Sequence, residues 1–334
     1  MIDCSNEGDR LHRDHSFVLP ASPLTDGIYN GTYSANRIVV GPPMWSGKEV
    51  CARMLMEKHS VMSGGVELAV HTAGAGSPVL LIHGFPDDHE VWEHQVPALV
   101  ASGHRVIAPD TRGCGNSTIP PQVADYRIDQ LVSDMIAVLD HFGIARAALV
   151  AHDWGALIGW RLAIAHPDRI ERYAALSVGH PAALGAGGLR QMLKSYYIFL
   201  FQIRGLGEWL LRGRNWRMVR AMAKTPEEAQ RAVERLSRPG RLTAGINYYR
   251  ANMRMFRDRG VPKCTGMPVL GIASDGDPYI TEQPMRDTGS FVDGPFRFEL
   301  IRGAGHWLQR DRPEEVNALL VEFLGAGVKS SDAD

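Results

Sequence analysis

The stretch LVAHDWG, residues 149–155, decides how the rest of the chain is interpreted. A short apolar run, AALVA (147–151), leads into it, and a helix-like run, WGALIGWRLAIAHP (154–167), leads out of it. Asp153 is therefore predicted to lie on a sharp turn from strand to helix, between the small residues Ala151 and Gly155. Many hydrolases have a serine at such a turn, so a carboxylate there requires a chemical reason.

From Val66 onward, apolar runs typical of strands alternate with amphipathic stretches typical of helices. The candidate strands are VELAVHT (66–72), PVLLIHG (78–84), RVIAPD (105–110), AALVAHD (147–153), RYAALSV (172–178), PVLGIAS (268–274) and RFELIRG (297–303). The candidate helices include HEVWEHQVPALVAS (89–102), IDQLVSDMIAVLDHFG (128–143) and RPEEVNALLVEFLG (312–325). This alternation predicts an α/β fold with a mostly parallel sheet covered by helices on both faces.

Four segments follow from this pattern. Residues 1–55 lack a sustained period and are predicted to form a loose N-terminal extension without chemistry. Residues 56–178 and 263–326 are predicted to form the α/β core. Residues 179–262 are rich in arginine and aromatic side chains and contain no convincing strand, so a helical lid inserted into the core is expected there. Residues 327–334 should fray.

The composition limits the kind of partner. The chain has 334 residues, 45% of them hydrophobic, which is enough for a large core. Its 36 basic and 37 acidic side chains form no long run of one sign, so neither nucleic acid nor an anionic membrane is expected as a partner. A small uncharged molecule is the expected ligand, with no metal and no cofactor. The oligomeric state stays open, a homodimer included.

The sequence also favours a cytoplasmic location. The longest apolar run, YYIFLFQI (196–203), is too short to span a bilayer, and the N-terminus lacks the plan of a signal peptide. The cysteines form no CxxC pair, which favours reduced thiols over disulfides or a zinc site. They are Cys4, Cys51, Cys114 and Cys264.

Chemically capable residues follow four of the predicted strands, where open α/β sheets bind ligands. They are the segment HGFP (83–86), Asp153, the pair Asp275 and Asp277, and His306. Each has an ordinary structural interpretation, because an aspartate at a helix start is most often a cap and Asp-Pro is usually a turn. Together, however, they follow the order acid, acid, histidine of the hydrolase nucleophile elbow, with aspartate in place of serine.

With these motifs the chain resembles the epoxide hydrolases of the α/β-hydrolase fold. HGFP (83–86), HDWG (152–155) and AGHWLQRDRPEEVNALLVEFL (304–324) are similar to that family's motifs. SYYIFLFQ (195–202) and INYYRANM (246–253) are similar to its two lid segments with ring-opening tyrosines. The resemblance implies a detoxifying enzyme that acts on a small hydrophobic epoxide and water.

The resemblance also explains the aspartate. A carboxylate with an ordinary pKa of about 3.9 is ionised at neutral pH, so Asp153 could attack an epoxide carbon without a base and form an alkyl ester. His306, oriented by Asp277, would then activate water. Backbone N–H groups of Phe85 and Trp154 would stabilise the tetrahedral intermediate, and a cis bond is expected between Phe85 and Pro86. The preference for Asp277 over Asp275 rests on the following proline and on family spacing.

Each lid segment contains a Tyr-Tyr doublet, and helix neighbours point about 100° apart. Alignment on Phe201-Gln202 and on Asn247 with Arg250 selects Tyr197 and Tyr249 as the acids that protonate the opening epoxide, with Tyr196 and Tyr248 as packing residues. His152 could brace the site. The predicted substrate-binding set is Phe85, Trp154, Tyr197, Tyr249 and Trp307.

Two alternatives stay open. A haloalkane dehalogenase uses the same Asp-His pair but needs donors for a halide, and Phe85 stands where that family usually has asparagine. A non-catalytic ligand-binding protein could also have this fold, because fold alone guarantees no activity.

Overall fold

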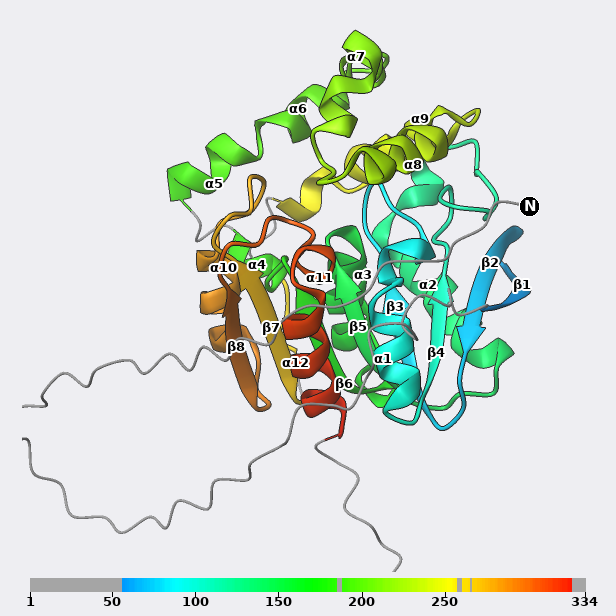
Figure 1. The fold of residues 1–334 in the computed structure, drawn as a ribbon, viewed down its shortest axis with the longest axis vertical. Coiled ribbons are helices and arrows are strands. Elements are labelled where there is room, and N and C mark those ends of the chain that lie inside the picture. The colour runs from blue at the N-terminus through cyan, green and yellow to red at the C-terminus, as the bar shows by residue number, and fades with distance from the viewer. Residues whose placement is uncertain (1–55, 185–187, 257–259, 265, 326–334) are drawn as a thin grey trace, which may run out of the picture. The chain divides into compact units, whose positions relative to one another are not determined.

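The computed structural model describes residues 56–184, 188–256, 260–264 and 266–325. The predicted extension (1–55) and tail (327–334) lie outside these residues. In the described residues, eight strands form one sheet in the order β1-β2-β4-β3-β5-β6-β7-β8 (Figure 1). They are β1 (Glu57–Ser63), β2 (Val66–Ala73), β3 (Ser77–Ile82), β4 (His104–Pro109), β5 (Ala147–His152), β6 (Ile170–Leu176), β7 (Val269–Ser274) and β8 (Phe296–Ile301). Only β1 and β2 run antiparallel to their neighbours, so the prediction of a mostly parallel sheet is confirmed.

Strand β1 was not predicted from the sequence. It pairs antiparallel with β2, with Val61 opposite Leu68. In its sequence EKHSVMS only Val61 and Ser63 are buried, so the strand lacks the apolar run or the alternation that identifies the other strands.

Helices cover both faces of the sheet. Helices α2 (Ile128–His141) and α3 (Trp154–Ala165) pack on one face, and α1 (Gln95–Ala101) and α12 (Pro313–Gly325) pack on the other. Because side chains alternate along a strand, Leu80 and Ile82 of β3 join the first cluster, whereas Val79 and Leu81 join the second. The sheet is therefore buried on both faces, which explains the nearly continuous apolar strands.

The helix predicted at residues 89–102 is two elements, a short 3₁₀ turn, η1 (His89–Trp92), and helix α1. Pro97 gives the reason. Proline has no N–H and is tolerated only in the first turn of a helix, so an α-helix through this residue has to begin shortly before it.

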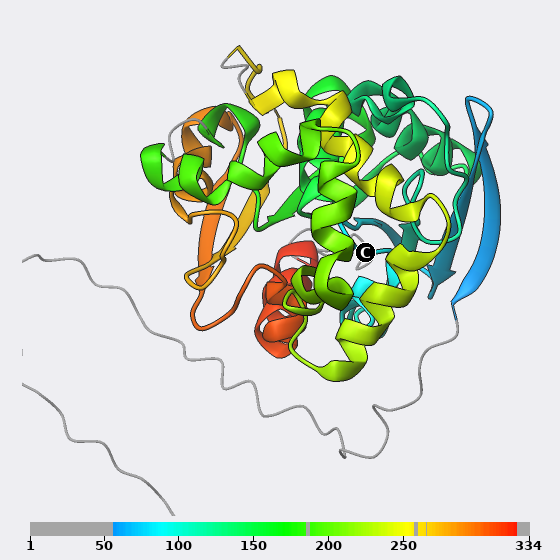
Figure 2. The same ribbon diagram turned by 90° about the horizontal axis from the view of Figure 1, so that it is seen from above.

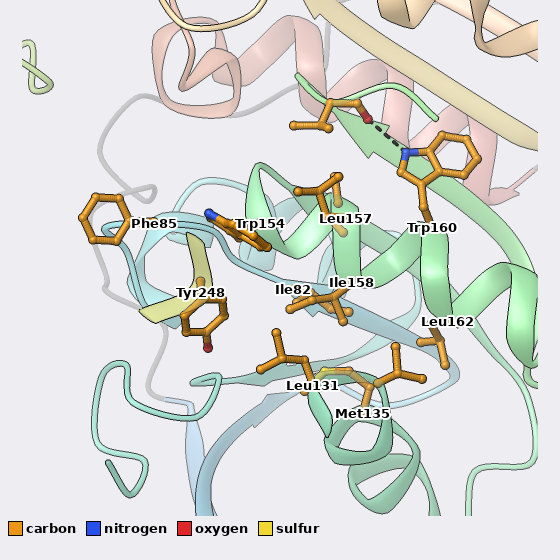
Figure 3. Close-up of a cluster of buried hydrophobic side chains, with 14 of the residues drawn as sticks. Ile82, Phe85, Leu131, Met135, Trp154, Leu157, Ile158, Trp160, Leu162 and Tyr248 are labelled. Carbon is orange, nitrogen blue, oxygen red and sulfur yellow. Dashed lines mark hydrogen bonds between the residues drawn. The ribbon is translucent and has the colours of Figure 1, made fainter. Parts of the chain in front are cut away.

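A dense apolar cluster supports the start of α3 (Figure 3). Ile158 of α3 packs in this cluster with Ile82 of β3 and with Leu131 and Met135 of α2. Trp160 is fully buried, and its indole N–H donates to the carbonyl of Val178 at 3.0 Å, which joins α3 to the segment after β6. The turn that bears Asp153 is therefore built on a rigid, close-packed base.

The described residues between β6 and β7 are helical. They form α4 (Pro181–Leu184), α5 (Gly188–Lys194), α6 (Tyr196–Gln202), α7 (Leu206–Arg220), α8 (Pro226–Ser237) and α9 (Arg241–Ala251). Helices α5 to α9 lie beyond the carboxyl ends of the strands (Figure 1), and Figure 2 looks down on them from that side. We call these five helices the lid. The limits predicted for the lid segment, residues 179–262, stay a prediction. In the described residues, no helix combines the length and apolar character needed to cross a bilayer.

Candidate active site

Asp153 lies on a strained turn between β5 and α3. Its φ of 53° is positive, which is unusual for a residue other than glycine and is often found at functional sites. Two glycines leave room for this turn. A Cβ at Gly84 would lie 2.4 Å from the Cβ of Asp153, and a Cβ at Gly155 would lie 2.1 Å from the carbonyl oxygen of Ile82. The turn and the loop after β3 can therefore touch only because both positions lack a side chain.

The two carboxylate oxygens of Asp153 have different surroundings. Oδ1 accepts a hydrogen bond from the backbone N–H of Phe85 at 2.8 Å, and the carboxylate also accepts one from the backbone N–H of Trp154. Oδ2 lies 3.3 Å from Nε2 of His306. Burial by itself would raise the pKa of Asp153, but the hydrogen bond and the charge of His306 lower it below its ordinary value. The carboxylate is therefore ionised at neutral pH. The Phe85–Pro86 bond is cis, as expected.

His306 is held between two carboxylates. Its Nδ1 lies 2.6 Å from Oδ2 of Asp277. Burial by itself would lower the pKa of His306, but the charge of Asp277 and the hydrogen bonds with Asp153 and Asp277 raise it to about 10. Burial opposes ionisation of Asp277 as well, yet the charge of His306 and the N–H groups of Tyr279 and Ile280 lower its pKa. At neutral pH the site thus contains an imidazolium between two carboxylates.

The structure distinguishes the two candidate acids after β7. Asp277 is buried against His306, whereas Asp275 is exposed and accepts the N–H of Gly303 at 2.8 Å. In the described structure, Asp277 and not Asp275 is therefore the carboxylate on the far side of His306.

Two further residues hold the backbone of His306, and one of them was not predicted. The hydroxyl of Ser177 donates to the carbonyl of His306 at 2.8 Å, and Nε2–H of His152 donates to the same oxygen at 3.0 Å. Burial and the charge of His306 lower the pKa of His152 to about 4, so this ring is neutral. His152 therefore contacts the backbone of His306, and its role in bracing the site stays a prediction. A lone serine such as Ser177 carries no recognisable motif, although it directly follows β6.

One tyrosine of each doublet lines both cavities together with Asp153. Tyr197 of α6 and Tyr249 of α9 line the same cavities as Asp153, and their ring centroids are 5.9 Å apart. Burial raises the pKa of both, so both stay protonated. Tyr248 is buried and donates to the carbonyl of Arg112 at 2.7 Å, as expected of a packing residue. Tyr196, predicted to be a packing residue, is 58% exposed on the outer face of α6 and lies at the edge of the larger cavity.

Two cavities of about 320 Å³ and about 500 Å³ meet at the candidate site. Asp153, Tyr197, Tyr249 and Tyr279 line both. Tyr279 was missed in the sequence analysis, although the rule that ligands bind after strand ends could have found it. Its ring centroid lies 5.3 Å from that of His306, and burial together with the charges of Asp277 and Asp153 raises its pKa to about 12. It is a third neutral phenol at the junction of the cavities.

The remaining predicted residues also reach these cavities. Trp154 lines the smaller cavity, and Phe85, His306 and Trp307 line the larger one. The indole N–H of Trp307 donates to Oδ2 of Asp87 at 2.6 Å, which fixes the ring at the cavity wall.

A second polar cluster lies away from this site, at the edge of β2 and β4. His71, His89 and Asp110 are the one group in the described residues whose side chains could together contact a metal ion. The two imidazole rings stack 3.3 Å apart at 8°, and Nδ1 of His89 lies 2.7 Å from Oδ1 of Asp110. The nitrogen lone pairs of the two imidazole rings lie in parallel planes, so these lone pairs do not point at one ion. The cluster is better described as a buried hydrogen-bonded group.

Comparison with known proteins agrees with this geometry. A family model described as "alpha/beta hydrolase fold" matches residues 77–313. Epoxide hydrolase A of Mycobacterium tuberculosis is 36% identical over 310 residues, which cover 79% of this chain and 96% of that protein. Epoxide hydrolase 3 of Xenopus tropicalis is 31% identical over 262 residues, covering 74% of this chain and 71% of that protein. The crystal structure of epoxide hydrolase A from Mycobacterium thermoresistibile superposes with a TM-score of 0.73 at 33% identity, covering 81% of this chain and 98% of the other.

The family model, the relatives matched over more than two thirds of their length and the similar crystal structure all indicate one family. The chain is a hydrolase that belongs to the epoxide hydrolase family of the α/β-hydrolase fold.

Proposed function

We propose that this enzyme converts a hydrophobic epoxide to a vicinal diol through an alkyl ester on Asp153. One observation carries the proposal: Oδ1 of Asp153 accepts the N–H of Phe85 at 2.8 Å, and the same aspartate shares two apolar cavities with Tyr197 and Tyr249. A fixed anion faces a cavity that also contains two neutral acids. This arrangement suits attack on a strained C–O bond.

In the first step, Oδ2 attacks an epoxide carbon and the C–O bond of the ring breaks. Oδ2 is the better placed nucleophile, because Oδ1 already accepts the backbone N–H of Phe85. The electron pair of the broken bond leaves as an alkoxide on the neighbouring carbon. Tyr197 or Tyr249 donates a proton to this oxygen, since both phenols remain neutral in the buried site.

In the second step, His306 takes a proton from water and the hydroxide attacks the ester carbonyl. The negative charge on the former Oδ1 develops against the N–H groups of Phe85 and Trp154. One such donor is typically worth about 3 kcal/mol of activation free energy. The bond between the ester carbonyl carbon and the alkyl oxygen then breaks, the proton left on the added oxygen passes to the departing diol oxygen, and the carboxylate returns.

The charge of Asp153 determines whether His306 is an imidazolium, as in the first step, or a neutral base, as in the second step. While Asp153 is ionised, its hydrogen bond and charge help to raise the pKa of His306. Esterification removes that charge, so the pKa of His306 falls and the neutral imidazole can act as a base. The protons balance, because the His306 imidazolium returns a proton to the tyrosinate left by ring opening and becomes neutral, and it then regains a proton from the attacking water.

The proposed scheme predicts the origin of the oxygen in the diol. In a single turnover with excess enzyme in ¹⁸O-water, the label should enter the Asp153 carboxylate and the first diol should be unlabelled, because the diol oxygen comes from Oδ2. Mass spectrometry of the diol and of the peptide with Asp153 measures both. A labelled diol in the first turnover would mean direct attack by water.

Removal of the negative charge at Asp153 should lower the pKa of His306. In Asp153→Asn, the pKa of His306 should be lower than in the wild type, because the remaining carboxylate, Asp277, stabilises the imidazolium alone. NMR titration of ¹⁵N-labelled histidine measures this, with Asp275→Asn as the control that leaves the titration unchanged. An unchanged His306 pKa in Asp153→Asn would contradict the switch from imidazolium to base.

The two alternative functions predict different results in assays with an epoxide and with a bromoalkane. A haloalkane dehalogenase would release bromide from a bromoalkane, and a ligand-binding protein would act on neither substrate class. We expect diol from styrene oxide and no bromide. The apolar side chain of Phe85, which lines the larger cavity, cannot donate a hydrogen bond to a halide.

A further inference from the structure

The outer surface of α5, α6 and α7 combines exposed apolar side chains with arginines. We call it the lid surface. Its apolar members, 40% to 68% exposed, are Leu189, Met192, Leu193, Tyr196, Phe199, Ile203, Trp209 and Met218. Its basic members are Arg190, Arg204, Arg212, Arg214 and Arg217. In the described residues, Met62 on β1 is the one other large apolar side chain as exposed as these. Exposed apolar side chains concentrated in this way mark an interaction surface.

Helix α6 shows how this surface arises. Tyr196 and Phe199, with Ile203 just after the helix, recur at intervals of three and four residues and lie exposed on one side. Ile198 and Phe201 are buried on the opposite side, in the core cluster. The helix therefore has two apolar faces, of which the interior of the protein covers one. The run YYIFLFQI is too short to cross a bilayer, but its outer face suits the boundary between water and lipid.

The charge of the lid surface differs from that of the whole chain. Residues 188–220 contain seven basic side chains and one acidic side chain, Glu208, which is paired with Arg250 at 2.8 Å. The other residues have 36 − 7 = 29 basic and 37 − 1 = 36 acidic side chains. None of the five exposed arginines forms an ion pair with a described residue. The expectation that no anionic membrane is a partner rested on the charge balance of the whole chain and on the lack of a long run of one sign, which do not describe this local excess of basic side chains.

We propose that the lid surface docks on an anionic lipid bilayer. The apolar side chains would enter the boundary between headgroups and acyl chains, while the arginines contact lipid phosphates. A second copy of the chain fits less well. A twofold interface would bring two copies of this basic surface together, and the one acid of residues 188–220, Glu208, is already paired with Arg250.

The position of the lid surface suggests a purpose, which rests on the proposed function. Met192 and Phe199 of this surface also line the smaller cavity, and Leu193, Tyr196 and Met218 line the larger one. A hydrophobic epoxide dissolved in the bilayer could therefore move from the lipid into either cavity without crossing water. The inferred substrate class is an epoxide that partitions into membranes.

Co-sedimentation of the full chain with lipid vesicles tests the docking. Phosphatidylcholine vesicles with about 30% phosphatidylglycerol should bind the protein at least about tenfold more tightly than vesicles of phosphatidylcholine alone, and salt should weaken the binding. Arg204→Glu/Arg212→Glu and Ile203→Ser/Trp209→Ser should each weaken it by about tenfold or more. None of these four residues lines either cavity. The matched control Lys58→Glu/Met62→Ser changes the same kinds of exposed side chain on β1 and should bind like the wild type.

Absence of binding to the anionic vesicles would overturn the inference, and so would equal loss in the β1 control. A dimer in sedimentation equilibrium that Ile203→Ser/Trp209→Ser dissociates, without vesicle binding, would assign the surface to a second copy. Hydrolysis of dissolved styrene oxide separates the two proposals. Vesicle binding without hydrolysis defeats only the proposed function, and hydrolysis without vesicle binding defeats only the docking. If both hold, the lid variants should hydrolyse dissolved styrene oxide at the wild-type rate but vesicle-borne epoxide more slowly.

Discussion

His306→Ala should form the alkyl ester on Asp153 and then stop. The nucleophile keeps its backbone hydrogen bond from Phe85 at 2.8 Å, so ring opening can still occur, whereas the base for water is missing. Intact mass spectrometry with a slight excess of epoxide should show one added substrate mass, and steady-state turnover should fall by about 10⁴-fold or more. Asp153→Ala should be equally inactive without any added mass.

His306→Ala should also lower the folding stability of the protein. Removing the imidazole leaves the half-buried Asp153 and the buried Asp277 without their shared cation, and breaking a buried pair typically costs about 3–5 kcal/mol of folding stability. His306→Gln preserves a polar group at the position and serves as the second variant. Asp275→Asn is the matched control, because this exposed aspartate follows the same strand but lies away from His306. Folded His306 variants that show no adduct under these conditions would refute the two-step scheme.

Joint replacement of Tyr197 and Tyr249 by phenylalanine should slow ring opening by about 10³- to 10⁴-fold, because the alkoxide would form in a buried site without an acid. Each single variant should be affected less, since the other phenol lines the same cavities. Ester hydrolysis should change little. Single-turnover experiments that follow ester formation and ester decay separately measure both rates.

The neighbouring tyrosine of the second doublet is the control. Tyr248→Phe removes a hydrogen bond to the carbonyl of Arg112, so it should lower stability by about 1 kcal/mol and leave ring opening nearly unchanged. If the double variant slows ester formation and ester hydrolysis equally, the phenols are not the acids of the first step. In that case Tyr279, which lines both cavities, becomes the candidate.

Most of the sheet could be predicted because its signal is local. Strands such as β5 and β7 are buried on both faces and appear in the sequence as short continuous apolar runs. β1 gave no such signal, because it lies at the sheet edge and exposes most of its residues. The division of the predicted helix at residues 89–102 depended on the position of Pro97 and on how the chain packs around it.

The sequence by itself determined the family, the mostly parallel α/β sheet and the order of candidate catalytic residues along the chain. These features depend on hydrophobic periodicity, on turns that only small residues permit and on motifs, all of which act over a few residues. Only the tertiary structure decided which side chains meet. It places Asp277 rather than Asp275 against His306, and Ser177 against the backbone of His306. It also places Tyr279 where the two cavities meet and exposes Tyr196. The fold leaves the arginines of residues 188–217 exposed as well. The contacts of the site join segments up to 220 residues apart, as between Asp87 and Trp307, and long-range packing sets them, not local propensity.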